Sequence, residues 1–320
     1  MVVMMLRRRI SAPSLALAAT AVTGSLLLTA CGGSSSAQSA DGKLNVVASF
    51  YPMQYLAEQI GGEHVNVTDL TAAGTEPHDL ELTAKQVAAV QNAGTVLYLK
   101  GLQPTVDKAV AQSRSAHIVD ATAFSPLVDH HLDEGSTATD GHDHPGDAGD
   151  PHIWLDPTRY AAVAKGVGAE LAKADPAHAA DYQKNTDDLV ARLATLDQGF
   201  QSGLKGCTNK AFVTSHAAFG YLADHYGLEQ IAINGVDPES EPTPARLAQI
   251  QQAAKDHGVS TIFFETLVSP KLAESVAKDL NLKTAVLDPL EGVKDAKNDN
   301  YLSVMQQNLT NLRAALGCTA

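Results

Sequence analysis

Short β-branched runs alternate with amphipathic patterns along most of this chain. From Lys43 onward, the extended segments KLNVVASF and TVLYLK are separated by helical patterns such as YPMQYLAEQIGG. A second series begins after residue 207, with KAFVTS, STIFFET and KTAVLDP as its extended segments. Alternation of strand and helix is typical of parallel sheets covered by helices. The pattern therefore predicts an α/β protein with two lobes, each with a mainly parallel sheet flanked by helices.

A long helical pattern separates the two series. It covers residues 176–204, has no internal proline, and begins where Pro176 follows Asp175, which predicts a helix start with the aspartate as its cap. At 1.5 Å per residue such a helix would span roughly 40 Å. We therefore expect one long rigid helix to join an N-terminal lobe, residues 43–175, to a C-terminal lobe, residues 205–320.

The N-terminal residues have the pattern of an export signal. Three arginines, at positions 7–9, precede an uncharged apolar run over 15–30 that is short for a membrane span. Small residues before Cys31 resemble a bacterial lipobox, although an ordinary cleavage site with a chance cysteine would also fit. We expect residues 1–30 to be a lipoprotein signal peptide, Cys31 to carry the lipid, and residues 31–42 to be a flexible tether. The predicted location is the extracytoplasmic face of the cell membrane, with a lipid anchor.

The net charge limits the classes of binding partner, and the cysteine content limits the kinds of cysteine site. The formal net charge is −13, from 23 basic and 36 acidic residues, so nucleic acid is a poor partner and a cation a better one. Apart from Cys31, the chain has Cys207 and Cys318, without a C-x-x-C spacing. In an exported protein such a pair predicts a disulfide, with two buried free thiols as the alternative.

An acidic, histidine-rich segment interrupts the first series. Residues 129–150 contain seven acidic residues and no Lys or Arg, which predicts an exposed insertion. Its four histidines are His130, His131, His142 and His144. We expect them to bind zinc weakly and to raise its concentration near a tighter site; a solvated spacer with incidental histidines is the alternative.

Three other histidines lie where predicted strands end or ordered chain resumes. His78 follows VNVTDLT, His152 lies just before a predicted helix, and His216 directly follows KAFVTS. Carboxyl ends of parallel strands border the crevice in which α/β proteins bind ligands. The positions predict a metal site between the lobes, although any single histidine could instead be an ordinary surface or core residue.

A carboxylate would complete a site that suits Zn²⁺. Asp288 ends the strand KTAVLDP and is the candidate fourth ligand, which gives three imidazoles and one carboxylate. Glu76 and Glu265 are competing carboxylates. Glu265 also ends a strand and could instead hold an imidazole N–H from outside the coordination sphere.

Five ordered motifs make the chain recognisable. GTEPHDLELT, DPHIWLDP, SHAAFGYLADHYGL, IFFETLVSPKLAESVA and LDPL resemble the zinc- and manganese-binding proteins of bacterial ABC transporters, from about Lys43 to the end of the chain. The resemblance implies two α/β lobes joined by a long helix, with the metal in the cleft between them. It implies His78, His152, His216 and Asp288 as ligands, although water or Glu76 takes the fourth position in some zinc-binding members.

The resemblance also implies a function. Manganese-binding members carry glutamate at the third position, whereas this chain has His216, so the expected cargo is Zn²⁺. We expect a monomeric lipoprotein that delivers this ion to the membrane permease of a zinc ABC transporter and is not an enzyme. Manganese or iron binding within the same family is the alternative. A zinc-dependent hydrolase would also need three ligands and an open position, but the chain has no H-E-x-x-H motif. An adhesin displayed by the same anchor would need an apolar or aromatic binding face, which 5% aromatic residues do not favour.

Overall fold

The computed structural model describes residues 39, 41–130, 149–295 and 298–319, which belong to one structural unit that begins at Ser34. In the N-terminal lobe the strands are β1 (Leu44–Ala48), β2 (Val65–Asp69), β3 (Thr95–Tyr98) and β4 (His117–Asp120). The helices of this lobe are α1 (Tyr51–Gly61), α2 (Ala84–Asn92) and α3 (Pro104–Ala111). The strands form a parallel sheet in the order β2-β1-β3-β4.

The C-terminal lobe repeats this arrangement. Its strands are β5 (Ala211–Thr214), β6 (Glu229–Ala232), β7 (Thr261–Phe264) and β8 (Lys283–Val286). Its helices are α6 (Gly220–Tyr226), α7 (Pro244–Asp256), α8 (Lys271–Leu280) and α9 (Tyr301–Leu316). The sheet is again parallel, in the order β6-β5-β7-β8. The predicted α/β fold with two parallel sheets is therefore confirmed.

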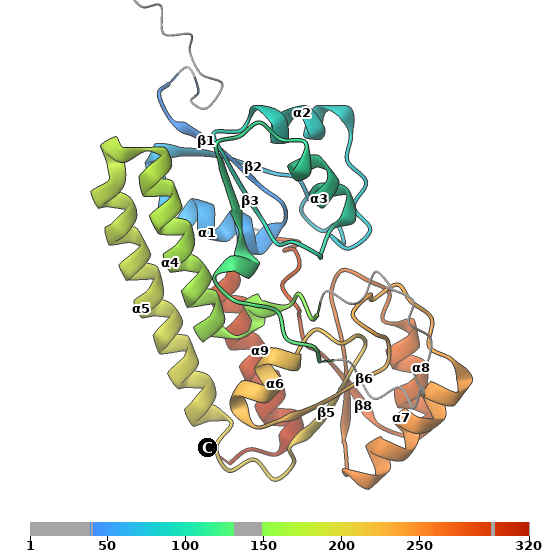
Figure 1. Cartoon of the computed structure of the whole chain (residues 1–320). Coiled ribbons are helices and arrows are strands. Elements are labelled where there is room, and N and C mark those ends of the chain that lie inside the picture. Colours follow the sequence, from blue (N-terminus) through green and yellow to red (C-terminus); the bar gives the residue numbers. More distant parts are fainter. Residues whose placement is uncertain (1–38, 40, 131–148, 296–297, 320) are drawn as a thin grey trace, which may run out of the picture. The chain divides into compact units, whose positions relative to one another are not determined.

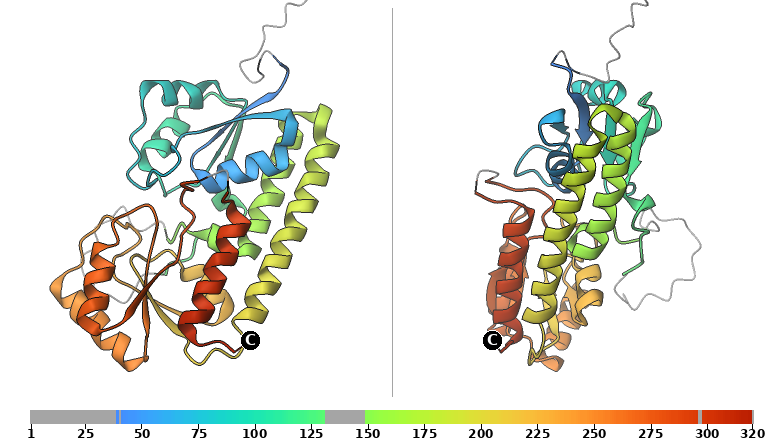
Figure 2. Two further views of the ribbon diagram at one scale, coloured as in Figure 1. Left: turned by 180° about the vertical axis from the view of Figure 1, so that it is seen from behind. Right: turned by 90° about the vertical axis from the view of Figure 1, so that its left-hand side faces the viewer.

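Two long helices run beside both lobes. They are α4 (Pro157–Ala174) and α5 (Ala179–Gly203), which lie side by side in Figure 1, and α5 packs on α1, α4 and α9. Figure 2 shows α5 extending from the level of the N-terminal sheet to that of the C-terminal sheet. The helix between the lobes is thus supported along its length by other helices. None of the described helices combines the length and hydrophobicity that crossing a bilayer requires.

The joining segment becomes helical at Pro176, as expected, but its first turn is a 3-10 turn and the Asp175 side chain does not cap it. A 3-10 turn covers Pro176–His178 before α5 begins, and Asp175 makes no capping hydrogen bond to it. The Oδ2 atom of Asp175 instead accepts a hydrogen bond from Tyr182 at 2.8 Å and lies 2.6 Å from Nδ1 of His178. These side-chain partners occupy the carboxylate that would otherwise bond to backbone N–H groups.

A close approach between α4 and α5 depends on a glycine. A Cβ atom on Gly168 would lie 2.1 Å from the Oγ1 atom of Thr186, far inside van der Waals contact. Thr186 is buried, and its hydroxyl donates to the carbonyl of Tyr182 at 2.7 Å. Since neither helix can move outward without exposing the core between them, position 168 is restricted to glycine.

Buried aromatic residues join the two lobes in one core. The hydroxyl of Tyr160 on α4 donates to the carbonyl of Pro52 on α1 at 2.6 Å, and its ring lies 4.5 Å from that of Tyr301 on α9. The hydroxyl of Tyr301 donates to the carbonyl of Trp154 at 2.5 Å. All three aromatic side chains are fully buried. The core therefore fixes the chain around Trp154 against helices from both halves.

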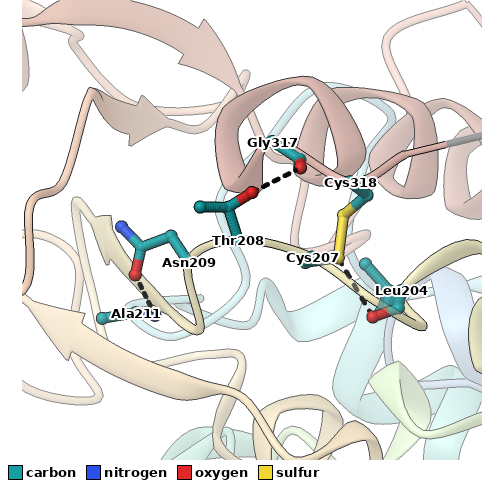
Figure 3. The surroundings of a disulfide bond; sticks show 7 residues. All are labelled: Leu204, Cys207, Thr208, Asn209, Ala211, Gly317 and Cys318. Carbon is teal, nitrogen blue, oxygen red and sulfur yellow. Dashed lines mark hydrogen bonds between the residues drawn. A yellow bond between two sulfur atoms is a disulfide. The ribbon is translucent and has the colours of Figure 1, made fainter.

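Cys207 and Cys318 form a disulfide, shown in Figure 3. The bridge joins the segment before β5 to the segment after α9, and the hydroxyl of Thr208 donates to the carbonyl of Gly317 at 3.1 Å beside it. The bridge closes a loop of 111 residues, which contains the β5–β8 sheet. It therefore ties the last helix back to the start of the C-terminal lobe.

Candidate metal centre

Four side chains from both lobes converge on one point. Their ligand atoms all lie within 4.8 Å of one another, and the residues are His78, His152, His216 and Glu291. His78 follows β2 and His152 precedes α4 in the N-terminal half, whereas His216 follows β5 and Glu291 follows β8 in the C-terminal half. The three histidines that the sequence singled out are thus brought together, with a different carboxylate from the one expected.

The distances between the Glu291 oxygen and the three imidazole nitrogens suit a tetrahedrally coordinated ion. The Oε1 atom of Glu291 lies 3.2 Å from Nε2 of His78, 3.1 Å from Nε2 of His152 and 3.2 Å from Nε2 of His216. Ligands at zinc bond lengths of 2.0–2.1 Å in a tetrahedron are roughly 3.3 Å apart. The three separations between the carboxylate oxygen and the imidazole nitrogens are therefore close to those around a tetrahedral Zn²⁺ ion.

The site is almost closed to solvent. His152, His216 and Glu291 have exposed fractions of 0%, 1% and 0%, and the His78 side chain is 11% exposed. Outside this group, no comparable set of metal-ligating side chains occurs in the described parts of the chain. Burial of this kind strengthens electrostatic interactions because little water screens them.

Two of the imidazoles are oriented by further carboxylates. Nδ1 of His152 lies 2.7 Å from Oδ1 of Asp150, and Nδ1 of His216 lies 2.9 Å from Oε1 of Glu265. Glu265 thus occupies one of the two roles that the sequence left open for it. Such partners fix the tautomer, because Nδ1 then carries the proton and Nε2 is left to bind the metal.

Local backbone structure positions His152. Ile153, Trp154 and Leu155, which follow it, form a buried 3-10 turn, and Asp156 then caps α4 by accepting from the N–H of Thr158 at 2.7 Å. The Trp154 indole donates to the carbonyl of Pro289 at 2.7 Å. This bond connects the segment that carries His152 directly to the loop that carries Glu291.

Asp288 does not join the ligand group. Its Oδ1 atom accepts from the N–H of Leu290 at 2.8 Å, and its Oδ2 atom accepts from the hydroxyl of Thr266 at 2.7 Å. Leu290 has a φ of +56°, in the left-handed region that is rare for leucine. Asp288 therefore stabilises the turn that points Glu291 toward the histidines, and Glu291 is the ligand candidate that the sequence analysis missed.

The other residues that the sequence suggested for metal binding or lipidation lie outside the ligand group or outside the described residues. Glu76 accepts from the backbone N–H of His78 at 3.0 Å and does not belong to the ligand group. His130 lies between two carboxylates, with Nδ1 at 2.8 Å from Asp150 and Nε2 at 3.1 Å from Asp224, and it does not belong to the ligand group. Cys31, His131, His142 and His144 lie outside the described residues, and their roles stay predictions.

The electrostatics of the metal-free site are set by burial and mutual charge. Burial alone would lower the pKa of His152, but Asp150 and Glu291 outweigh it and raise that pKa. For His216 the carboxylates of Glu265 and Glu291 raise the pKa well above its usual value in the same way. Burial alone would raise the pKa of Glu291, but the His216 charge and the imidazole hydrogen bonds hold it well below its usual range. The buried carboxylates thus favour positive charge on these imidazoles, and protons compete with a metal ion for the same nitrogens.

A two-lobed α/β fold with a buried His₃–Glu site between the lobes is the architecture of a metal-binding solute-binding protein. The sequence profile of the family described as "Zinc-uptake complex component A periplasmic" (ZnuA) matches residues 46–315. This match covers most of the chain. The chain belongs to the ZnuA family.

Individual relatives agree with this assignment. The chain is 36% identical over 301 residues to the high-affinity zinc uptake system protein ZnuA of Bacillus subtilis (strain 168). The matched region covers 91% of this chain and 94% of that protein. The chain is 38% identical over 304 residues to the zinc-binding lipoprotein AdcA of Streptococcus pneumoniae (strain ATCC BAA-255 / R6), covering 90% of this chain but 58% of that longer protein. The structure of the Zn(II)-bound ZnuA-like domain of Streptococcus pneumoniae AdcA has a TM-score of 0.71 and 34% identity, and covers 86% of this chain and 99% of the domain.

Proposed function

We propose that this protein captures Zn²⁺ between its two lobes and delivers it to an ABC-type importer. The observation that carries this proposal is the convergence of three imidazole Nε2 atoms on one carboxylate oxygen, at 3.1–3.2 Å. The ligands are His78, His152, His216 and Glu291. Neutral imidazoles with a single carboxylate favour zinc, whereas manganese prefers a site richer in oxygen ligands.

Ligands on both lobes suggest how capture could be coupled to delivery. Full coordination requires His78 and His152 of the N-terminal half to meet His216 and Glu291 of the C-terminal half. An ion therefore binds most tightly to the arrangement in which these four residues are close. Because α5 is packed along its length, we expect small movements of the site loops, such as the loop after β8, to weaken the coordination and release the ion to the permease.

The membrane location is part of the same proposal. Residues 1–30 would be removed as a signal peptide, Cys31 would carry a lipid, and residues 31–42 would tether a monomer to the extracytoplasmic face of the membrane. A tether keeps the carrier close to its permease and so raises the effective concentration for delivery. Labelling with a radioactive fatty acid, with Cys31→Ala as the unlabelled control, tests the anchor separately from zinc binding.

Competition with a zinc chelator of known affinity tests the binding function. We expect the wild-type protein to hold one Zn²⁺ tightly, and His152→Ala to lose this binding. His257→Ala is the matched control, because His257 is exposed and lies 3.4 Å from Glu229, away from the ligand group. Tight zinc binding that survives in His152→Ala would contradict the assignment of the site, and turnover of peptides or esters by the zinc-loaded protein would contradict the carrier function.

A further inference from the structure

A cavity of about 510 Å³ adjoins the metal centre. It lies between α1 and the loop after β8, which approach each other in the left-hand view of Figure 2, and Glu291 is part of its wall. Three more acidic residues line it, namely Glu58, Asp69 and Asp299. Of the residues that the structure describes, no Lys, Arg or His belongs to the lining. We call this space the acidic cavity.

Apart from Glu291, the carboxylates of the acidic cavity have no cationic partner among the described residues. Among the described residues none of Glu58, Asp69 and Asp299 forms an ion pair; Glu58 accepts from the amide of Gln54 at 2.8 Å and Asp69 from the N–H of Thr71 at 3.1 Å. Burial raises the pKa of Asp69 to about 7, and the negative charge of Glu58 adds to the shift. When burial makes a carboxylate difficult to ionise, a nearby cation stabilises its ionised form strongly.

A second and independent observation concerns Glu291 itself. Its Oε1 atom faces the three imidazoles, but its Oε2 atom is buried and has no hydrogen-bond partner among the described residues. A fully buried carboxylate oxygen without a donor is unfavourable. Because Glu291 also lines the acidic cavity, its side chain belongs to both places and has one oxygen still available to a cation.

We propose that the acidic cavity is the entry site for the metal, where a hydrated divalent cation is held before Glu291 passes it to the three histidines. This inference rests on the proposed zinc-binding function. The cavity is large enough for an ion with its water molecules, each of which occupies roughly 30 Å³. Carboxylates of one sign in a hollow concentrate cations and accelerate their association, by a factor of about 10 or more. Glu291 then exchanges water for protein ligands as the ion moves inward.

Stopped-flow mixing of Zn²⁺ with the metal-free protein, followed with a fluorescent zinc indicator, tests the entry site. The variant Glu58→Gln/Asp299→Asn removes two charges from the cavity. The control Asp256→Asn/Glu274→Gln removes two charges from exposed positions on α7 and α8. At low ionic strength we expect the cavity variant to bind zinc about 5–10-fold more slowly and the control to stay within about twofold of wild type. High salt should reduce the difference.

A variant that removes a positive charge near the cavity provides a second test, with the opposite expected effect. Arg192 on α5 donates to Oε1 of Gln59, a residue of the cavity wall, at 2.9 Å. Arg192→Gln should therefore speed zinc association, by about twofold. Equal association rates in the cavity and control variants, with tight binding intact, would overturn the entry site alone. Absence of tight zinc binding in the wild-type protein would overturn the proposed function as well.

Discussion

The Oδ1 atom of Asp150 lies 2.7 Å from Nδ1 of His152 and also accepts the backbone N–H of that residue at 2.9 Å. The carboxylate thereby fixes both the ring and the main chain of a metal-ligand candidate. We expect Asp150→Asn to weaken zinc binding by about 10–100-fold, because the amide removes the negative charge that makes His152 a stronger ligand. Chelator competition measures this. Asp187→Asn, an exposed change on α5, should leave affinity unchanged; equal affinities of the two variants would contradict the role of Asp150.

Glu291 and Asp288 should respond differently to loss of charge. Glu291→Gln removes the negative charge of the proposed carboxylate ligand, so we expect zinc affinity to fall by more than the roughly 100-fold upper bound for an outer partner. Asp288→Asn alters a residue that holds the turn through Leu290, and we expect a loss of about 10-fold or less. Zinc titration of both variants decides the matter. A larger loss in Asp288→Asn than in Glu291→Gln would return Asp288 to the coordination sphere.

Zinc binding should release protons near neutral pH. The pKa values of His152 and His216 are raised in the metal-free protein, so these imidazoles keep protons above the usual value of about 6.5. Their contribution to the stability of the metal-free protein is complete below that value and is lost as pH rises through the raised pKa values. Zinc affinity and thermal stabilisation by zinc should therefore both increase with pH through this range.

Calorimetric titration in buffers of different ionisation enthalpy measures this proton release. The observed enthalpy at pH 7 should vary between the buffers, with a slope that corresponds to about one proton or more per zinc ion. Glu291 has a lowered pKa and stays ionised, so it should contribute none of these protons. A binding enthalpy that is the same in all buffers would contradict the prediction.

Gly168 and Gly199 should respond in opposite ways to alanine. Gly168→Ala places a Cβ atom 2.1 Å from Oγ1 of Thr186, and we expect the free energy of unfolding to fall by about 1–3 kcal/mol. A Cβ atom on Gly199, within α5, would lie 3.9 Å from Cδ2 of Leu309, an ordinary contact. Gly199→Ala should raise the free energy of unfolding by about 0.5–1 kcal/mol through helix propensity. Denaturant unfolding measures both, and destabilisation of similar size would contradict the packing account.

Removal of the disulfide should affect stability but not zinc binding. The double change Cys207→Ser/Cys318→Ser opens a loop of 111 residues, which should reduce the free energy of unfolding by about 2–4 kcal/mol. Neither cysteine belongs to the metal-ligand group. Denaturation and zinc titration of the variant measure the two effects, and a large loss of affinity would show that the bridge also positions the site.

The sequence predicted the fold well because two parallel sheets produce a strong alternation of short apolar and amphipathic segments. It also indicated His78, His152 and His216, since each lies where a strand ends or ordered chain resumes. Glu291 was missed because the last strand is followed first by Asp288, and the chain reaches Glu291 only through Leu290 with a φ of +56°. Leucine carries no signal for a left-handed turn, unlike glycine or asparagine.

Partners that depend on distant contacts were also beyond sequence reasoning. The carboxylates of the acidic cavity come together only when α1 meets the loop after β8. The side-chain cap expected at Asp175 is absent because Tyr182 donates a hydrogen bond to that carboxylate. Local patterns thus predicted the elements and most of the ligands, whereas the contacts around them required the three-dimensional structure.

A crystal structure of the zinc-loaded protein, with anomalous scattering measured at the zinc absorption edge, tests the central claim most directly. We expect one strong anomalous peak between the lobes, from an ion bound by Nε2 of His78, His152 and His216 and by a carboxylate oxygen of Glu291. A zinc ion coordinated by Asp288 or Glu76 in place of Glu291, or bound away from these histidines, would contradict it.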